Sequence, residues 1–295
     1  MSNGFVTWWQ GLPERMDPVI FSIGSFSIQY YGLMYLVAFL IVGFLAWSRV
    51  KKEGRFPINS EQLQSLMTAM ILGVLIGGRL GYVLFYNPMH YLTHPLEIIN
   101  PFRTSGGFQF TGISGMSYHG GVIGVIVGAI VYCRQQKLDF FLMGDLIGPC
   151  IPLGYMFGRL GNFINGELWG RPTEAAIGMH FPLAGEGLRH PSQLYEAFFE
   201  GIFLFVILWL LRKRVKTKGA MLTFYLTGYG LVRFFVEYTR EPDAHLGFVL
   251  GSLSMGQVLC LLMIFGGIGM YLLLRRKEAQ DRLKAQTKKR KKSRS

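Results

Sequence analysis

Thirteen consecutive residues decide how this chain is interpreted: Gly158-Arg159-Leu160-Gly161-Asn162-Phe163-Ile164-Asn165-Gly166-Glu167-Leu168-Trp169-Gly170. They place a cation, two amides, a carboxylate and four glycines directly after a long apolar run. Arginine is costly at membrane depth, so we expect Arg159 to have a partner, and an anionic ligand is one such partner. Asn162 and Asn165 can supply donors and acceptors around that ligand. The alternative is a glycine-rich helix end whose arginine extends to the interface.

The composition is that of a membrane protein. Of the 295 residues, 51% are hydrophobic and only 16% are charged, which is too apolar for a soluble protein. We therefore expect an all-α polytopic membrane protein. The net charge is +13, but residues 275–295 hold eleven lysines and arginines against two acidic residues. We expect one transmembrane domain, 1–274, and a disordered cytoplasmic tail, 275–295, that binds anionic lipid and not nucleic acid.

Seven apolar segments are candidates for transmembrane helices. Basic residues follow the first, third, fifth and seventh, while the other loops mix a few arginines with acids and prolines. The positive-inside rule then places the N-terminus in the periplasm and the C-terminus in the cytoplasm. The loop 87–115, rich in proline and glycine, predicts a short periplasmic element. The seven segments are approximately Ile28–Trp47, Leu66–Phe85, Met116–Cys133, Phe140–Phe163, Ala197–Leu211, Ala220–Tyr238 and Leu253–Leu274.

The cysteines give no sign of a metal site or a disulfide framework. Cys133, Cys150 and Cys260 all lie in or at the end of apolar runs, without metal-ligand spacing. We expect them to be small buried apolar side chains, and we expect no metal and no cofactor. Asp145, near the cytoplasmic end of the fourth segment, is expected to be structural.

The remaining polar residues of the predicted spans fall at one depth. At about 1.5 Å per residue, Arg79 lies roughly 9 Å from the periplasmic end of its helix, and two further arginines lie at a similar depth. The other polar groups lie at the first residues of predicted helices or in the adjoining loops, all on the periplasmic side. We therefore expect a single polar cavity that opens toward the outer leaflet. The side chains concerned are Tyr31, Arg79, His119, Arg159, Glu167, His190 and Arg233.

Several of these residues also have a structural interpretation. Arg233 and Glu237 are one helical turn apart and can pair with each other. Arg79 can extend to the interface or close a structural ion pair. His119 can be a hydrogen-bonded interface histidine, and Tyr31 can belong to an aromatic belt.

The motifs together resemble a known family. The segment Gly158–Gly170 resembles the signature of the bacterial prolipoprotein diacylglyceryl transferases. The likeness covers nearly the whole chain, through Asp17-Pro18-Val19-Ile20-Phe21, Tyr31–Tyr35, Gly77–Tyr82, Met116–Gly121, Arg189–Glu196, and Gly228-Tyr229-Gly230 leading to Arg233.

This resemblance implies the first step of bacterial lipoprotein maturation, in the inner membrane. The diacylglyceryl group of phosphatidylglycerol moves to the thiol of the lipobox cysteine in a prolipoprotein, and glycerol phosphate is released. The family's functional positions match Tyr31, His119, Arg159, Asn162, Glu167, Gly170 and Arg233. From the resemblance we expect Tyr31, His119, Arg159 and Arg233 to be catalytic. We expect phosphatidylglycerol to be bound by Arg79, Arg159, Asn162, Asn165, Glu167, Gly170, His190 and Arg233.

The residue types suit the implied reaction. Arginine stays protonated and offers paired donors to phosphate, so Arg159 and Arg233 can favour the more charged transition state. The attacking thiol has an unperturbed pKa near 8.5, so a base or a positive field must help to form the thiolate. His119 is the candidate base, and the field of the arginines is the alternative. A lipid substrate must enter sideways, so we expect a lateral gap lined by glycine and other small residues.

Two other functions are compatible with parts of the pattern. A lipid or anion transporter could use the same arginines, but it would need ionisable groups along the whole crossing, and many transporters contain internal repeats. A non-catalytic assembly protein would leave the ordered set of motifs unexplained.

Overall fold

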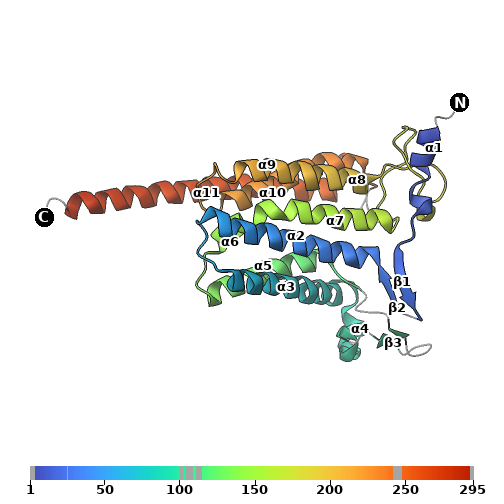
Figure 1. Cartoon of the computed structure of the whole chain (residues 1–295), viewed down its shortest axis with the longest axis horizontal. Coiled ribbons are helices and arrows are strands. Elements are labelled where there is room, and N and C mark those ends of the chain that lie inside the picture. The colour runs from blue at the N-terminus through green and yellow to red at the C-terminus, as the bar shows by residue number, and fades with distance from the viewer. Residues whose placement is uncertain are drawn as a thin grey trace. The chain divides into compact units, whose positions relative to one another are not determined.

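A computed structural model describes residues 4–24, 26–99, 102–103, 109–110, 115–241 and 248–292 (Figure 1). The secondary structure is helical apart from short two-stranded sheets. The chain divides into two compact units, which are described in turn. The first comprises Met1–Ile20, Gln29–Ala46 and Gly144–Ser295, and the second comprises Phe21–Ile28 and Trp47–Met143.

The first unit contains most of the helices. In the segment from Ser192 to Leu211, two α-helices flank a π-helix, a form that is frequent at functional sites. Pro152 stands in the first turn of α7, where its missing N–H costs no hydrogen bond. The helices are α2 (Tyr30–Glu53), α6 (Phe140–Ile147), η3 (Gly148–Cys150), α7 (Ile151–Ile164), α8 (Ser192–Glu196), the π-helix η5 (Ala197–Phe203), α9 (Leu204–Leu211), α10 (Ala220–Val236) and α11 (Met255–Lys292).

Asp145 fixes the start of α10. Its carboxylate accepts hydrogen bonds from the backbone N–H groups of Gly219 (2.7 Å) and Met221 (2.7 Å). Asp145 is fully buried, so these bonds satisfy amides at the N-terminus of α10 that otherwise have no partner. The expectation that Asp145 is structural is confirmed. Cys133, Cys150 and Cys260 are buried free thiols, as expected.

The second unit is built on the close pairing of α3 (Ser60–Tyr86) and α5 (Tyr118–Gln135). Glycines face each other across this pair, and a Cβ at Gly124 would collide with the backbone of Gly73 and Gly77. Small residues at such positions let membrane helices pack backbone to backbone. At its start, α3 has a capping box formed by Asn59 and Gln62.

Short elements occupy the connections. The loop 87–115 contains secondary structure, as its composition predicted, namely α4 (Pro88–Thr93), η2 (Pro95–Ile98) and the paired strands β3 (Phe102–Arg103) and β4 (Gln109–Phe110). The others are α1 (Gly4–Gln10), η1 (Pro13–Arg15), β1 (Val19–Ile23), β2 (Phe26–Gln29), η4 (Pro182–Ala184), η6 (Glu237–Thr239), β5 (Phe248–Leu250) and β6 (Leu253–Ser254).

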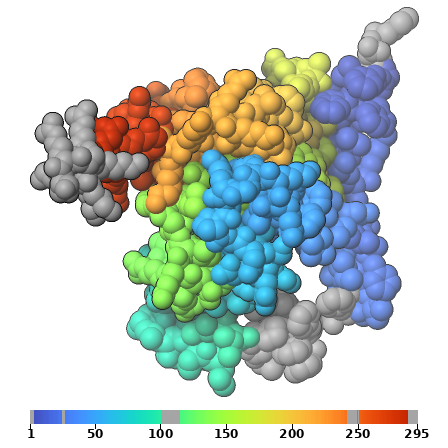
Figure 2. All heavy atoms as spheres, turned by 60° about the vertical axis from the view of Figure 1, so that its left-hand side comes forward, coloured from blue at the N-terminus to red at the C-terminus, as the bar shows by residue number. Residues whose placement is uncertain are grey.

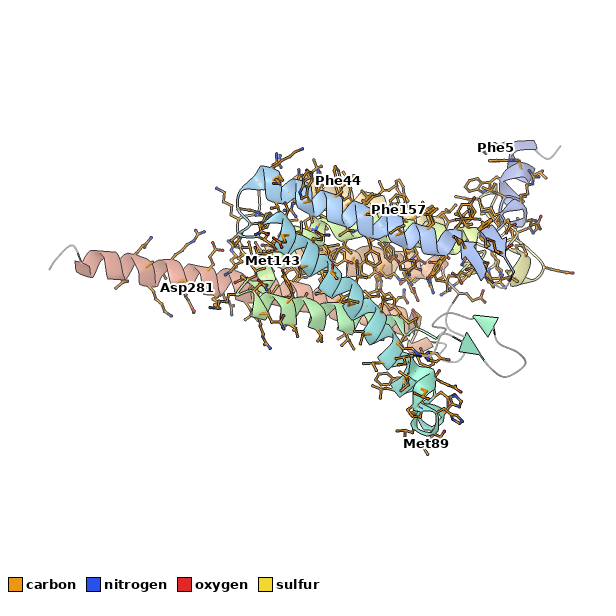
Figure 3. All side chains as sticks on the ribbon, turned by 60° about the horizontal axis from the view of Figure 1, so that its bottom comes forward. Phe5, Phe44, Met89, Met143, Phe157 and Asp281 are labelled. Carbon is orange, nitrogen blue, oxygen red and sulfur yellow. The ribbon has the colours of Figure 1, made fainter. Side chains whose placement is uncertain are left out.

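All seven predicted spans are helical. Among the described residues, five helical segments are long and apolar enough to cross a membrane: Tyr30–Glu53, Ser60–Tyr86, Phe140–Ile164, Ser192–Leu211 and Met255–Thr287. The other two, α5 and α10, have 18 and 17 residues. Large apolar side chains cover the outside of these helices, such as Phe44 on α2, which is 63% exposed (Figure 3). The helices are those of a polytopic membrane protein, while the total of seven crossings stays a prediction.

The tail differs from expectation. Helix α11 continues beyond Arg275 to Lys292, where the composition predicted disorder. Lysine, arginine, alanine and glutamine all have high helix propensity. In addition, Arg282 pairs with Glu278 one turn earlier at 2.5 Å.

Candidate active site

Arg159 is the centre of a polar cluster in the first unit, on the last turns of α7. Its Nε lies 2.6 Å from the Tyr155 hydroxyl and 2.7 Å from Glu196 Oε2. Its Nη1 donates to Asn162 Oδ1 at 3.0 Å. The guanidinium also stacks over the Tyr155 ring at 4.7 Å from the ring centroid. Arg159 is therefore held on several sides, and it is not a side chain that extends freely to the interface.

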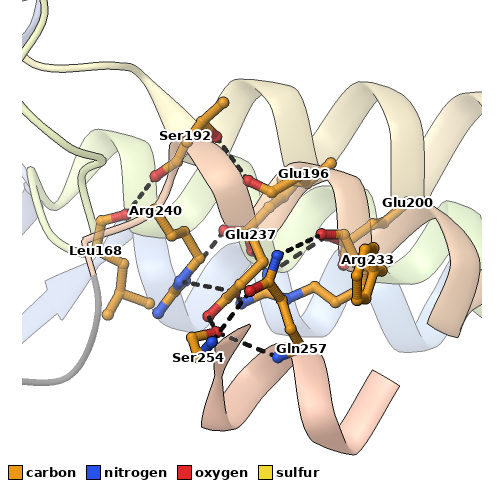
Figure 4. A network of polar contacts seen from close by, with 12 residues as sticks. Leu168, Ser192, Glu196, Glu200, Arg233, Glu237, Arg240, Ser254 and Gln257 are labelled. Carbon is orange, nitrogen blue, oxygen red and sulfur yellow. Dashed lines mark hydrogen bonds and ion pairs between the residues drawn. The ribbon is translucent and has the colours of Figure 1, made fainter. Parts of the chain in front are cut away.

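Glu196 joins this arginine to two others. Arg233 Nη1 lies 3.0 Å from Glu196 Oε2, and Arg240 Nη1 donates to Glu196 Oε1 at 3.0 Å (Figure 4). Glu196 is fully buried, and the side chains of the three arginines are only 14–18% exposed. A buried carboxylate of this kind requires counter-charges and hydrogen bonds, and it has both.

Two further carboxylates complete the arginine–glutamate cluster, which we define as Arg159, Arg233, Arg240, Glu196, Glu200 and Glu237. Arg233 Nη2 donates to Glu237 Oε2 at 2.8 Å, which confirms the predicted pairing one helical turn apart. Glu200, on the π-helix η5, lies 3.4 Å from Arg233 Nη1. Ser254 Oγ donates to Glu237 Oε1 at 3.1 Å. Three arginines thus face three carboxylates within a largely buried volume.

The amides of the signature connect Arg159 to Glu167. Asn162 accepts from Arg159 and donates through Nδ2 to Glu167 Oε1 at 2.7 Å. Asn165 Nδ2 lies 3.5 Å from the same carboxylate oxygen. Tyr31, at the start of α2, packs against Gly161, and its hydroxyl lies 3.0 Å from that of Tyr35. The structure therefore brings Tyr31, Arg159, Asn162, Asn165 and Glu167 together.

The end of the signature is a tight turn. Gly166 and Leu168 both have positive φ, +64° and +60°, which is uncommon for a leucine. Gly170 then passes so close to other backbone that a Cβ would contact the Thr239 carbonyl and would lie 2.8 Å from His190 Cβ. The backbone N–H of Gly170 donates to the His190 carbonyl at 2.8 Å. Packing therefore requires glycine at this position.

His190 borders the cluster through Tyr195. Its Nδ1 lies 3.1 Å from the Tyr195 hydroxyl, and its ring is half-buried. Burial lowers the pKa of His190, because the charged imidazolium loses solvation. The nearby N-terminal segment packs on the same region, where Trp9 Nε1 donates to the Ile177 carbonyl at 3.0 Å (Figure 2).

Arg79 and His119 belong to the second unit. Arg79 Nε donates to the Ile98 carbonyl at 2.7 Å, and Nη2 donates to the Glu97 carbonyl at 2.6 Å. These hydrogen bonds connect α3 to the loop that follows it, so the described contacts of Arg79 are structural. His119 is exposed at the start of α5, with its ring 5.7 Å from that of Tyr118. The arginine–glutamate cluster, by contrast, is formed entirely by residues of the first unit.

Sequence reasoning missed several members of the cluster. Glu200 and Arg240 were not identified, and Glu196 was noted only as the end of a motif. Tyr155, whose hydroxyl donates to Glu196 Oε2 at 3.1 Å, was read as part of an apolar helix. One signal was available for Glu200, a carboxylate inside the apolar run Ala197–Leu211, which is expensive unless a cation faces it.

The fold and the cluster define an integral membrane protein with a buried set of arginines suited to an anionic ligand. Sequence comparison gives a more specific result. A family model described as prolipoprotein diacylglyceryl transferase matches residues 18–273, and the chain belongs to this family.

The relatives with high identity are named phosphatidylglycerol–prolipoprotein diacylglyceryl transferase, and three of them illustrate the match. The protein of Chlorobaculum tepidum is 54% identical over 267 residues, which are 90% of this chain and 92% of the relative. The protein of Bordetella bronchiseptica is 48% identical over 263 residues, 89% and 97% of the two chains. The protein of Wolinella succinogenes is 45% identical over 272 residues, 92% and 97%. The family resemblance inferred from the motifs is confirmed.

Proposed function

We propose that this chain transfers the diacylglyceryl group of phosphatidylglycerol to the lipobox cysteine of a prolipoprotein. The thiolate sulfur forms a thioether with the glyceryl CH₂, the C–O bond to phosphate breaks, and glycerol phosphate leaves. The names of the relatives support this reaction, which is the first step of lipoprotein maturation. The observation that carries the proposal for this chain is the convergence of Arg159 and Arg233 on one buried carboxylate, Glu196.

The geometry suggests how a phosphate is bound. Arg159 is held in place through Nε, which contacts Tyr155 and Glu196, and through Nη1, which donates to Asn162. A phosphodiester that approaches Nη2 adds a charge-assisted bond without breaking the others. Because negative charge grows on the phosphate as the C–O bond breaks, the arginines stabilise the transition state more than the bound lipid.

The surrounding residues then have distinct roles. Asn162, Asn165 and Glu167 position Arg159 through the amide–carboxylate chain, and Tyr31 closes the same end of α7. Gly170 permits the close packing of the turn. His190 is proposed to contact the lipid headgroup.

The roles of the two residues of the second unit rest on the sequence: His119 matches a functional position of the family, and Arg79 was selected for its charge and its depth in the predicted span. His119 is proposed as the base for the thiol, with the field of the arginines as the alternative. Arg79 is proposed to bind phosphatidylglycerol, although its described contacts indicate a structural role.

We further propose seven membrane crossings in the bacterial inner membrane, with a periplasmic N-terminus and a cytoplasmic C-terminus. Basic residues follow α2, α5, α9 and the apolar part of α11. The cluster lies at the opposite helix ends, namely the first half of the segment Ser192–Leu211 and the ends of α7 and α10. This arrangement supports a catalytic site near the periplasmic interface, where a lipobox cysteine follows the signal peptide.

The test uses purified protein, phosphatidylglycerol and a lipobox peptide. Mass spectrometry should show a gain of one diacylglyceryl group per peptide and the release of glycerol phosphate. A peptide with serine in place of the cysteine should not change in mass. Absence of any mass gain with correctly folded protein would refute the proposed function.

A further inference from the structure

An open groove of about 370 Å³ lies beside the arginine–glutamate cluster, between α10 and the helix formed by α8 and η5. Its walls are aromatic and aliphatic, and hydroxyl-bearing side chains occur only at Tyr195 and Thr239 among its lining residues. The sequence predicted a lateral gap lined by small residues, whereas this groove is lined by large ones. The lining includes Tyr195, Phe199, Phe203, Leu231, Phe235 and Thr239.

The groove has a polar end and an apolar end. A Cβ on Gly228 would lie 2.7 Å from Leu204 Cδ1, and Arg233 contacts both Glu196 and Glu200. Residue numbers therefore rise in opposite directions along the two walls. Tyr195 and Thr239 lie at one end, and Phe203 and Leu231 lie toward the other.

The polar end belongs to the candidate active site. Tyr195 precedes Glu196 in α8, and its hydroxyl lies 3.1 Å from His190 Nδ1. The Thr239 carbonyl accepts a hydrogen bond from the Arg171 N–H at 2.9 Å, directly after the signature. A lipid phosphate on the arginines therefore has the mouth of an apolar groove next to it.

The size of the groove selects its occupant. A protein cavity of about 150 Å³ takes one benzene, so about 370 Å³ corresponds to roughly 15 carbon atoms. That is the size of one acyl chain. A single turn of helix, about 10 Å wide and about 5.4 Å high, already occupies roughly 400 Å³, and the apolar region of a signal peptide has two to four such turns. The groove is therefore too small to enclose that helix.

We propose that the groove holds one acyl chain of the donor lipid and that its far end, formed by Phe203 and Leu231, determines which acyl-chain lengths are preferred. The inference rests on the proposed function, because it takes phosphatidylglycerol as the substrate. Charge and shape agree in this assignment, since the phosphate faces the arginines while the chain extends away from them along an apolar wall. Leu231, Phe203 and Phe235 are 50%, 46% and 63% exposed, so the groove is accessible from the surrounding lipid.

The test is a competition between lipids in one reaction. Equimolar dilauroyl, dimyristoyl and dipalmitoyl phosphatidylglycerol are supplied with one lipobox peptide, and the product masses report the ratio of chains transferred. A ratio does not depend on how much of a variant is folded. Leu231→Trp fills the far end and should shift the ratio toward dilauroyl product by at least about threefold. Phe203→Ala lengthens the groove and should shift the ratio toward dipalmitoyl product.

The matched control is Leu210→Trp, an equally apolar substitution on α9. Leu210 is 68% exposed and is not among the lining residues, so the product ratio should equal that of the wild type. An unchanged ratio in both Leu231→Trp and Phe203→Ala would overturn the inference. A change in the KM of the peptide with an unchanged lipid ratio would assign the groove to the peptide and would also overturn it. Absence of product in the wild type would instead refute the proposed function.

Discussion

Replacing Arg159 by lysine tests whether the guanidinium geometry matters or only its charge. Arg159 contacts Tyr155, Glu196 and Asn162 through two different nitrogens. A lysine ammonium is a point charge on a flexible stem, so it can keep the contact with Glu196 but not the full set. Arg159→Lys therefore leaves the net charge intact and removes the fixed geometry around it.

The expected loss follows from the number of contacts. Each hydrogen bond to a charged group contributes about 1.5–3 kcal/mol, and lysine loses at least one such bond together with the Nη2 donor. A total of about 2–4 kcal/mol in the transition state corresponds to roughly a 30- to 1,000-fold fall in kcat/KM. Arg159→Ala should fall at least as far.

The assay measures transfer to a lipobox peptide by purified protein, with thermal unfolding in the same detergent as a check on folding. Arg212→Lys is the matched control, because Arg212 stacks on Trp209 at the C-terminal end of α9, at the opposite end of the segment Ser192–Leu211 from Glu196. Its activity should stay close to the wild type. If Arg159→Lys keeps kcat/KM within about threefold of the wild type, Arg159 acts as a simple charge and the argument from geometry is wrong.

Three further results are expected. Gly170→Ala places a Cβ against His190 and should cost about 1–3 kcal/mol of stability, measured by thermal unfolding, whereas Gly158→Ala, whose Cβ meets open space within α7, should be neutral or stabilising. Burial lowers the pKa of His190, so the contribution of the neutral imidazole to stability is present above the unfolded pKa of about 6.5 and is lost as the pH falls through the folded value. His190→Gln should therefore reduce the fall in unfolding temperature between about pH 7 and pH 5. An unchanged slope of unfolding temperature against pH would refute this. Cysteine at Thr173 should react with a membrane-impermeant thiol reagent in intact spheroplasts and cysteine at Thr217 should not, and the reverse labelling would overturn the orientation.

The helices could be predicted from the sequence because apolar length alone specifies them. The bounds of α2, α3, α5 and α10 agree with the predicted spans to within a few residues at most ends, and the fourth predicted span, Phe140–Phe163, corresponds to α6, η3 and α7 together. The pair Arg233–Glu237 was also predictable, because helical periodicity places residues four apart on one face.

The rest of the cluster was not predictable, for physical reasons. Glu196 and Arg240 are 44 residues apart, and a contact at that separation depends on tertiary packing that periodicity does not encode. The π-helix around Glu200 is a local departure from the α-helical period. The hydrogen bonds from Arg79 to backbone carbonyls could not be predicted from residue types either, because every residue has a carbonyl. Gly170 is needed because the backbone of Thr239 and His190 passes close to it, and the sequence shows the glycine but not these neighbours.

The central claim is that the lipid phosphate binds at Arg159 and Arg233. Solid-state NMR tests it most directly, by measuring dipolar coupling between the phosphorus of bound phosphatidylglycerol and ¹⁵N-labelled arginine guanidinium groups in the full-length protein. A charge-assisted N–H···O bond places the two nuclei about 4 Å apart, so the wild type should show clear dephasing of the phosphorus signal. The Arg159→Lys/Arg233→Lys double variant should lose that dephasing. Undiminished dephasing in the double variant would show that the phosphate binds at other arginines and would contradict the account.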